Sequence, residues 1–141
     1  EYPFATKAPQ LGTYRSNSSE LRMCELPAIY QASGEGRGLG THFLKHLERA
    51  RLIFLILDPK TEFAPSLEAG YHTLLDTLKQ FNSDFVRTPR FLVVNKSDLL
   101  PRGKDRSKDF DVREKVFFVS AKTGTGISRL MNTAENFFRN P

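Results

Sequence analysis

Apolar and polar positions along the chain form short alternating segments first and longer apolar runs afterwards. TYRSN at 13–17 and ELRMCEL at 20–26 have the pattern of two strands, and the polar SNSS between them is typical of a hairpin turn. Continuous apolar runs predict further strands that are covered on both faces. These runs are RLIFLILD at 51–58, FLVVNK at 91–96 and VFFVSA at 116–121.

Helical periodicity occupies the segments between and after these runs. Thr41 is a candidate cap for one helix, and Pro65 precedes a second helix as its entry. The apolar positions at helical spacing are Phe43, Leu44 and Leu47 in the first helix, Leu67, Tyr71, Leu74, Leu75, Leu78 and Phe81 in the second, and Ile127, Leu130, Met131, Ala134, Phe137 and Phe138 in a third. Strands that alternate with helices predict an α/β fold, with a largely parallel sheet and helices on both of its faces.

The composition is that of an ordinary globular domain. The 141 residues are 39% hydrophobic and 26% charged, and the apolar runs are too short to span a bilayer, so we expect one soluble domain. Cys24 cannot form an internal disulfide and is expected to be a strand residue rather than a reactive thiol. A net charge of +5 allows a nucleic-acid partner, although the basic residues are dispersed. The mixed charges of residues 101–115 predict a solvated loop or helix face.

Polar motifs follow two of the apolar runs, where ligands bind in parallel sheets. Asn95-Lys96-Ser97-Asp98 comes directly after FLVV, and an ionised carboxylate at Asp98 would select guanine, which offers adjacent donors on its N1 and N2 edge. Asn95 can address the base or tie loops together, and the stem of Lys96 can lie along the base. Ser120-Ala121-Lys122 follows FFV, and there backbone N–H groups can meet the guanine carbonyl because Ala121 is small.

The two motifs together resemble the base-recognition motifs of the GTPase superfamily. YPFAT at 2–6, PQLG at 9–12, GEGRGLG at 34–40 and HFLKHLERARLIFLILD at 42–58 make nearly the whole chain similar to the Obg GTPases, a family associated with assembly of the large ribosomal subunit. The resemblance implies a P-loop NTPase-like (Ras-like) G domain that binds GTP or GDP with Mg²⁺. It implies guanine contacts at Asn95, Lys96, Asp98, Ser120, Ala121 and Lys122, a magnesium ligand at Thr6, and a switch II segment that includes Glu25, Ala28, Gly34 and Gly36.

The glycine run at 34–40 is therefore assigned to switch II and not to a phosphate loop. It lacks the G-x-G-x-x-G spacing and does not follow a buried strand directly. Glycine allows backbone angles closed to other residues, which suits a segment that changes shape with the nucleotide. The alternative is an inert flexible connection.

Several positions depart from the family pattern. Glu25-Leu26-Pro27-Ala28 stands where the family has Asp-x-Pro-Gly, so the longer Glu25 must adjust to meet a magnesium-bound water, and Ala28 narrows the backbone angles at the γ-phosphate contact. Ile29 stands where many GTPases place a water-orienting glutamine, and Ala5 replaces the first threonine of a usual pair. No catalytic side chain is assigned.

The Walker A sequence G-x-x-x-x-G-K-S/T does not occur in these residues, although the family places it upstream of Thr6. We therefore expect residues 1–141 to be a partial Obg-type G domain, from switch I to the final helix, without the first strand and phosphate loop. In this fold the first strand lies between ELRMCEL and RLIFLILD, so its removal would leave two unpaired strand edges.

Two function hypotheses remain. One is an Obg-like GTPase that uses a GTP/GDP switch during assembly of the large ribosomal subunit. The other is a pseudo-GTPase scaffold that binds the subunit without hydrolysing GTP. By resemblance, the partners are ribosomal RNA and ribosomal proteins of the assembling subunit, with no membrane partner and no stable homo-oligomer. The relaxed switch II and a pI near 9.5 favour the mitochondrial matrix over a bacterial cytoplasm.

Other candidate residues have simpler interpretations. His42 and His46 are four apart on an expected helix, but no third metal ligand is evident, so metal binding is the minor alternative. Arg49 and Arg51 could contact RNA phosphate, although arginines at a helix end more often serve the helix dipole or solvent. Asp58 is interpreted as a turn former beside Pro59, and the phenylalanines are interpreted as core residues rather than base-stacking platforms.

Overall fold

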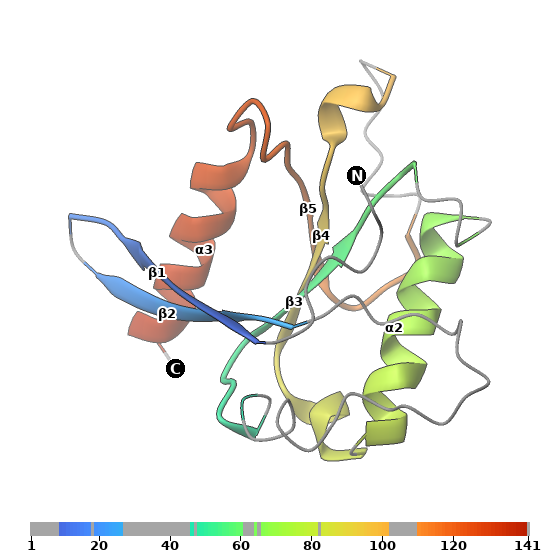
Figure 1. Ribbon diagram of the computed structural model, residues 1–141, viewed down its shortest axis with the longest axis horizontal. Coiled ribbons are helices and arrows are strands. Elements are labelled where there is room, and N and C mark those ends of the chain that lie inside the picture. The colour runs from blue at the N-terminus through green and yellow to red at the C-terminus, as the bar shows by residue number, and fades with distance from the viewer. Residues whose placement is uncertain are drawn as a thin grey trace.

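The computed structural model describes residues 9–17, 19–26, 46, 48–60, 64, 66–81, 83–101 and 110–140. Within these residues it contains a two-stranded sheet and a three-stranded sheet, with helices packed beside the latter (Figure 1). The elements are β1 (Gln10–Arg15), β2 (Glu20–Glu25), β3 (Ile53–Leu57), α2 (Leu67–Phe81), a 3-10 helix (Ser83–Arg87), β4 (Arg90–Val94), a 3-10 turn (Ser97–Leu99), β5 (Lys115–Phe118) and α3 (Ile127–Arg139).

β1 and β2 form the antiparallel hairpin that the sequence predicts, but the first strand is displaced from its expected position. It runs from Gln10 to Arg15 instead of 13–17. Its end moves because Ser16 closes the turn: the Ser16 N–H donates to the Ser19 carbonyl at 2.9 Å, and the Ser19 N–H donates to the Ser16 hydroxyl at 3.2 Å. Side chain and backbone of the same serine therefore stop the ladder.

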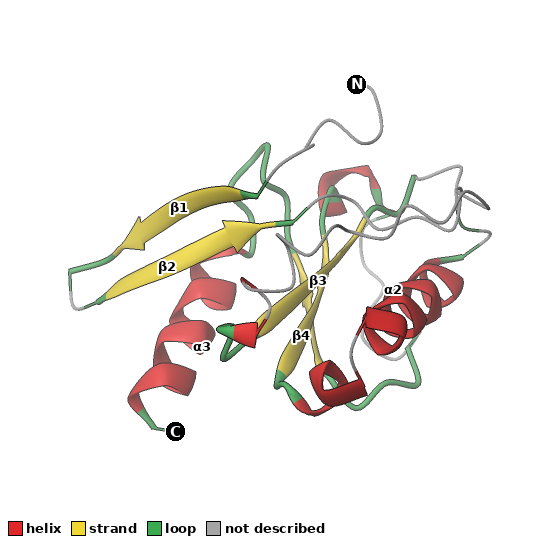
Figure 2. Ribbon diagram, turned by 60° about the horizontal axis from the view of Figure 1, so that its bottom comes forward, coloured by secondary structure: helices red, strands yellow, loops and turns green. Residues whose placement is uncertain are grey.

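The hairpin is attached to α3 by apolar packing and one short hydrogen bond. Tyr14 and Leu21 lie opposite each other in the ladder and pack against the cluster that contains the buried face of α3. The Ser19 hydroxyl donates to a carboxylate oxygen of Glu135 at 2.6 Å, and Glu135 is almost fully buried. The hydrogen bonds from Ser16 and Ser19 lower the pKa of Glu135. Figure 2 shows the hairpin lying alongside α3.

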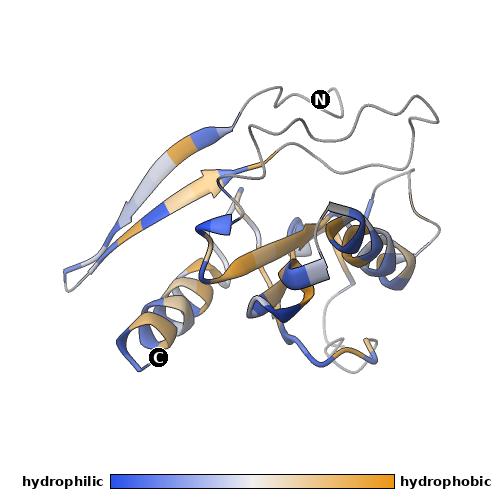
Figure 3. Ribbon diagram, turned by 90° about the horizontal axis from the view of Figure 1, so that it is seen from below, coloured by the Kyte–Doolittle hydropathy of each residue, from blue (hydrophilic) through white to orange (hydrophobic). Residues whose placement is uncertain are grey.

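β3, β4 and β5 are parallel and stand in that order, which confirms the parallel sheet. α2 and α3 lie on opposite sides of it (Figure 2), as the alternation of strands and helices predicts. β4 is the central strand, and successive side chains point to opposite faces: Leu92 and Val94 pack with the α2 cluster, and Phe91 and Val93 with the α3 cluster. In Figure 3 the strands of this sheet are mainly hydrophobic, whereas the helices carry both hydrophobic and hydrophilic residues.

β3 differs from the expectation of a strand covered on both faces. Leu55 and Leu57 are buried on the α2 side, but Ile56, on the other face, is 60% exposed. β3 has β4 as its single strand partner among the described residues. The α3 cluster covers Phe54 at the start of this face and does not include Ile56. The continuous apolar pattern was therefore interpreted correctly as a strand but wrongly as one with both faces covered in this chain.

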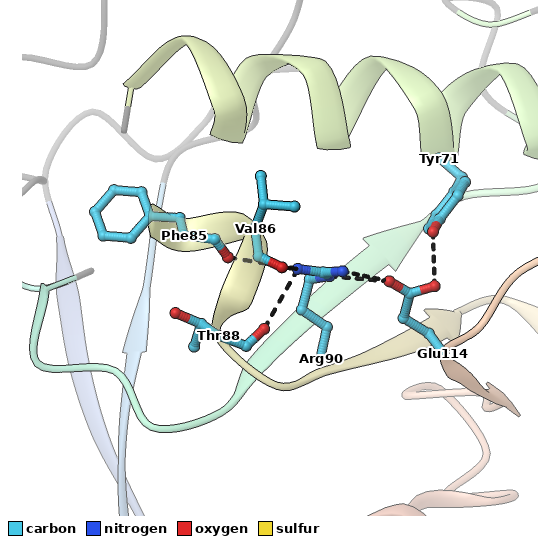
Figure 4. A network of polar contacts seen from close by, with 6 residues as sticks. All are labelled: Tyr71, Phe85, Val86, Thr88, Arg90 and Glu114. Carbon is cyan, nitrogen blue, oxygen red and sulfur yellow. Dashed lines mark hydrogen bonds and ion pairs between the residues drawn. The ribbon is translucent and has the colours of Figure 1, made fainter. Parts of the chain in front are cut away.

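A buried polar network joins the N-terminal part of α2 to the start of β4 and to the residue before β5 (Figure 4). Arg90 donates to one Glu114 oxygen from Nε at 3.0 Å and from a terminal nitrogen at 2.7 Å, and the Tyr71 hydroxyl donates to the other oxygen at 2.6 Å. The side chains of Arg90 and Glu114 are 14% and 6% exposed. Arg90 also donates to the carbonyls of Phe85, Val86 and Thr88.

The network corrects one expectation and explains two pKa shifts. Glu114 was placed in a solvated charged segment, yet its carboxylate is buried because Arg90 and Tyr71 satisfy it. Burial raises the pKa of Glu114, but the hydrogen bonds from Tyr71 and Arg90 outweigh it, so the pKa is lowered. Burial and the hydrogen bond to Glu114 raise the pKa of Tyr71 to about 12.

Some expectations lie outside the described residues. The helix after Thr41 is described only at His46 and Glu48, which are both helical. Within the part of the chain that the structure describes, no helix is long and apolar enough to cross a membrane.

Candidate functional site

The loops after β4 and β5 form one cavity at the carboxyl edge of the sheet. Its volume is about 670 Å³. Parallel strands place their following residues at the same edge, so segments more than 20 residues apart in sequence meet here. The lining residues are Asn95, Lys96, Asp98, Leu99, Ser120, Ala121 and Lys122. All six residues that the two motifs single out therefore lie together, and Leu99 is an addition that the motifs did not indicate.

Asn95 ties the two loops together, one of the two roles considered for it. Its backbone N–H donates to the Leu57 carbonyl at 2.9 Å, and its side-chain oxygen accepts the Ala121 N–H at 3.0 Å. The Asn95 side-chain amide forms no hydrogen bond as a donor within the described residues. It is therefore available to a ligand in the cavity.

Ser120 fixes the carboxylate of Asp98. The Ser120 side chain is fully buried, and its hydroxyl donates to one Asp98 oxygen at 2.6 Å while it accepts the Thr123 N–H at 3.2 Å. The hydrogen bond from Ser120 is the main cause of a lowered pKa at Asp98, and the Lys122 and Lys96 ammonium groups lower it further. Asp98 is therefore ionised at neutral pH, with lone pairs left to accept from a ligand.

Lys96 stands in an unusual backbone conformation at the rim of the cavity. Its φ of 56° and ψ of 34° are left-handed, and it is the one residue other than glycine with a positive φ among those described. Its ammonium lies 2.7 Å from a carboxylate oxygen of Asp58, the residue that follows β3. Asp58 was interpreted as a turn former, and it is one, because its other oxygen accepts the Lys60 N–H at 2.9 Å.

The loop that holds Ser120, Ala121 and Lys122 is shaped by glycines. Gly124 and Gly126 have φ of +79° and +75°, and a Cβ on Gly126 would lie 2.3 Å from the Phe118 carbonyl oxygen. The Gly124 N–H donates to the Ser120 carbonyl at 2.8 Å, which closes the loop before α3 begins. The Ala121 N–H already donates to Asn95, whereas the Lys122 N–H forms no hydrogen bond within the described residues. Lys122 therefore offers the unused backbone donor.

The expected magnesium and switch residues are mostly outside the described residues. Thr6, Ala28, Gly34 and Gly36 are not described, and Glu25 is the exposed last residue of β2, opposite Gln10 in the ladder. The described residues hold no group of three His, Cys, Asp or Glu side chains that could bind a metal ion. Cys24 lies in β2, as predicted, and partial burial raises the pKa of its thiol.

Sequence reasoning missed Asp58 as a part of this site, although a signal was present. Asp58 follows LIFLIL in the same way that Asn95 follows FLVV. The rule that gathers polar residues at the ends of adjacent parallel strands applies equally to all three strands. Applied in full, the rule places Asp58 beside Lys96, where the structure has it.

Comparison with known proteins agrees with these motifs. A family model described as 50S ribosome-binding GTPase matches residues 1–96. "GTPase Obg" of Chloroherpeton thalassium is 34% identical over 130 residues, 92% of this chain and 38% of that protein. "GTPase Obg" of Elusimicrobium minutum is 32% identical over 135 residues, 94% of this chain and 29% of that protein.

The match with these relatives covers nearly all of the chain, which spans about a third of their length. It extends past residue 96 into the part that contains the second motif, because 92% or more of the chain is aligned. The α/β architecture with a parallel sheet fits the same family. The chain therefore belongs to the 50S ribosome-binding GTPase family and, within it, to the Obg-type GTPases.

Proposed function

We propose that the cavity after β4 and β5 holds the guanine base of GTP or GDP, and that residues 1–141 are a partial G domain that supplies base recognition. The observation that carries this proposal is the Asp98 carboxylate, fixed at 2.6 Å by the buried Ser120 hydroxyl and facing the cavity. An ionised carboxylate accepts from guanine N1–H and N2–H, whereas adenine presents an acceptor at N1. The charge at Asp98 therefore favours guanine and disfavours adenine.

The remaining cavity residues complete the base contacts. The Asn95 amide can donate to the edge of the base away from Asp98, and the Lys122 N–H can donate to the guanine carbonyl. The aliphatic stem of Lys96 can cover one face of the base. Bound GTP would supply a γ-phosphate as the group that is cleaved, and Thr6 would hold the Mg²⁺ that accompanies it.

The family supports the proposal of a ribosomal partner. The matching family model is described as ribosome-binding, and the relatives are Obg GTPases. We place this chain on the assembling large ribosomal subunit, where a GTP/GDP switch would time its association. The net charge of +5 is compatible with a partner rich in RNA phosphate.

The test is a titration of the intact protein with fluorescent GDP and GTP in the presence of Mg²⁺. Wild type should bind both guanine nucleotides and not ADP. Asp98→Asn replaces an acceptor with a donor, so it should lose at least about tenfold in GDP affinity. The same variant should gain affinity for xanthosine diphosphate, because xanthine carries a carbonyl where guanine carries its amino group.

Asp76→Asn is the matched control. Asp76 pairs with Lys79 on the exposed face of α2, and the same chemical change there should leave GDP affinity unchanged. Equal binding of GDP and ADP by wild type, or equal GDP affinity in wild type and Asp98→Asn, would contradict guanine recognition by this cavity.

A pseudo-GTPase scaffold is the second candidate, and Glu25 at the end of β2 is the observation that favours it. A glutamate reaches one methylene further than the aspartate that the family has there, which disturbs the approach to a magnesium-bound water. Release of phosphate from GTP, measured with and without large ribosomal subunits, separates the two candidates. Binding of GTP without turnover in both conditions would favour the scaffold.

A further inference from the structure

Residues that follow β3 and β4 are joined by an ion pair at the rim of the cavity. The Lys96 ammonium lies 2.7 Å from Asp58 Oδ2, and the two side chains are 41% and 35% exposed. The Lys60 N–H donates to Asp58 Oδ1 at 2.9 Å, so both oxygens of this carboxylate are engaged. The Asp58 carboxylate is therefore held in place and can position the long side chain of Lys96.

The backbone of Lys96 adds a second constraint. A left-handed conformation is unfavourable for a residue with a Cβ. At Lys96 the following turn retains it, since the Leu99 N–H donates to the Lys96 carbonyl at 3.0 Å. The Lys96 side chain is thus held at both of its ends, at the backbone and at the ammonium. The four-carbon stem between them has few remaining conformations and lines the cavity.

We propose that Asp58 is a positioning residue for nucleotide binding, which acts by holding the Lys96 side chain along the cavity wall where the base would lie. This inference rests on the proposed function. A free lysine loses much of its rotamer entropy when it is ordered against a ligand, and an ordered one has lost it already. The pair also keeps the ammonium at Asp58. Without it, the ammonium could move toward Asp98, with which it already interacts, and compete with the base.

Stability and binding should respond differently to loss of this pair. Ion pairs exposed to this degree contribute little to folding because water screens them. In contrast, a side chain that is already ordered along the cavity wall lowers the free-energy cost of binding and so raises the ligand affinity. Asp58→Asn should therefore alter nucleotide affinity while the melting temperature stays close to that of wild type.

The experiment measures the GDP affinity of the intact protein as wild type, Asp58→Asn, Lys96→Met and the double variant. Asp58→Asn should weaken binding about three- to tenfold. Lys96→Met keeps an apolar stem but cannot pair with Asp58, so adding Asp58→Asn to it should produce no further loss. Asp76→Asn again serves as the control and should bind as wild type does.

The outcomes separate this inference from the function on which it rests. Unchanged GDP affinity in Asp58→Asn, or an equal Asp58→Asn effect in the Lys96→Met background, overturns the positioning role and leaves guanine binding intact. Absence of GDP binding by wild type overturns the proposed function and the inference together. A loss that disappears in the Lys96→Met background supports both.

Discussion

At the scale of single residues, Ser120 stabilises the charge of Asp98, on which base recognition depends. Its hydroxyl gives Asp98 a hydrogen bond of 2.6 Å, which lowers the pKa of Asp98 from its ordinary value of 3.8. In Ser120→Ala this donor is lost and the pKa rises. Because guanine requires the ionised carboxylate, the variant should lose GDP affinity at a higher pH than wild type as the solution is acidified toward ~4. GDP titrations over a series of pH values measure the difference.

Thr133→Ala provides the matched control for this prediction. The Thr133 hydroxyl donates to the Arg129 carbonyl on the exposed surface of α3, outside both motifs and outside the lining of the cavity. Its removal should leave the pH dependence of GDP binding unchanged. A Ser120→Ala profile that runs parallel to that of wild type at every pH would contradict a role for Ser120 in the ionisation of Asp98.

The sequence predicts which residues of the site lie together, but not which hydrogen bonds they form. The positions of Asn95, Asp98 and Ser120 follow from their place after buried strands, so their convergence was predictable. The direction of each hydrogen bond was not, because Asn95 had two possible partners and accepted the Ala121 N–H. The ion pair of Lys96 with Asp58 was not predictable either, because the sequence around Asp58 is explained equally well by a local turn.

At the scale of elements, the two glycines before α3 both have a positive φ but differ in the space around them, so substitutions at the two positions can be compared. Gly124→Ala would meet nothing within 4 Å and would add only the strain of a positive φ, about 1 kcal/mol. Gly126→Ala would place a Cβ 2.3 Å from the Phe118 carbonyl oxygen, so β5 and α3 must separate. We expect Gly126→Ala to lower the free energy of unfolding by about 2–4 kcal/mol, measured by denaturant titration. Equal losses in the two variants would contradict this account.

The network between α2, β4 and β5 predicts a dependence on alkaline pH. The pKa of Tyr71 rises from 10.0 to about 12 in the folded protein, so between these values the unfolded chain loses this proton and the folded one retains it. The unfolded state is favoured as pH rises, and the free energy of unfolding should fall by about 2 kcal/mol over this interval. Tyr71→Phe should remove that fall, at a cost of about 1.5 kcal/mol at neutral pH for the lost hydrogen bond to Glu114.

Tyr14→Phe is the control for the tyrosine prediction, since Tyr14 packs beside α3 and is outside the Tyr71–Glu114–Arg90 network. Because Tyr71 and its partners are unchanged in this variant, it should keep the alkaline fall in the free energy of unfolding. Tyrosinate absorbance gives an independent measurement, because the ionisation of Tyr71 near pH 12 should be seen in wild type and be missing in Tyr71→Phe. A Tyr71→Phe limb as steep as that of wild type would contradict the shift.

The elements also divide into those that sequence predicted well and those it did not. α2 and α3 begin and end near their expected residues because a long helical period is a strong signal. β1 ends before its expected last residue because Ser16 forms the turn, and the hydrogen bond that closes this turn cannot be read from the sequence. The sequence predicts a solvated charge at Glu114, since it does not show that Arg90 and Tyr71, from distant parts of the chain, satisfy this carboxylate.

At the scale of the whole molecule, the two sheets do not join within the described residues. β2 has β1 as its strand partner, and β3 has β4. The Ile53 N–H donates to the Pro89 carbonyl on the β4 side at 3.0 Å, and strand geometry therefore directs the N–H groups of Phe54 and Ile56 toward the other edge. Ile56 is also 60% exposed, an unusual state for an apolar residue inside a strand. Within the described residues, β3 therefore has an edge without a strand partner and a face that is only partly covered.

We propose that a further strand pairs with this edge of β3, as the family resemblance implies for a complete G domain. Amide hydrogen exchange tests it: Phe54 and Ile56 should exchange rapidly in residues 1–141 alone and be protected in the intact protein, because an unpaired edge leaves its N–H groups open to solvent. The amides of Leu92 and Val93 in the central strand β4 serve as internal controls and should be the better protected in both samples. An incomplete sheet should also give residues 1–141 a broad thermal transition. A sharp cooperative melt of residues 1–141, with Phe54 and Ile56 already protected, would show that the edge of β3 needs no further strand.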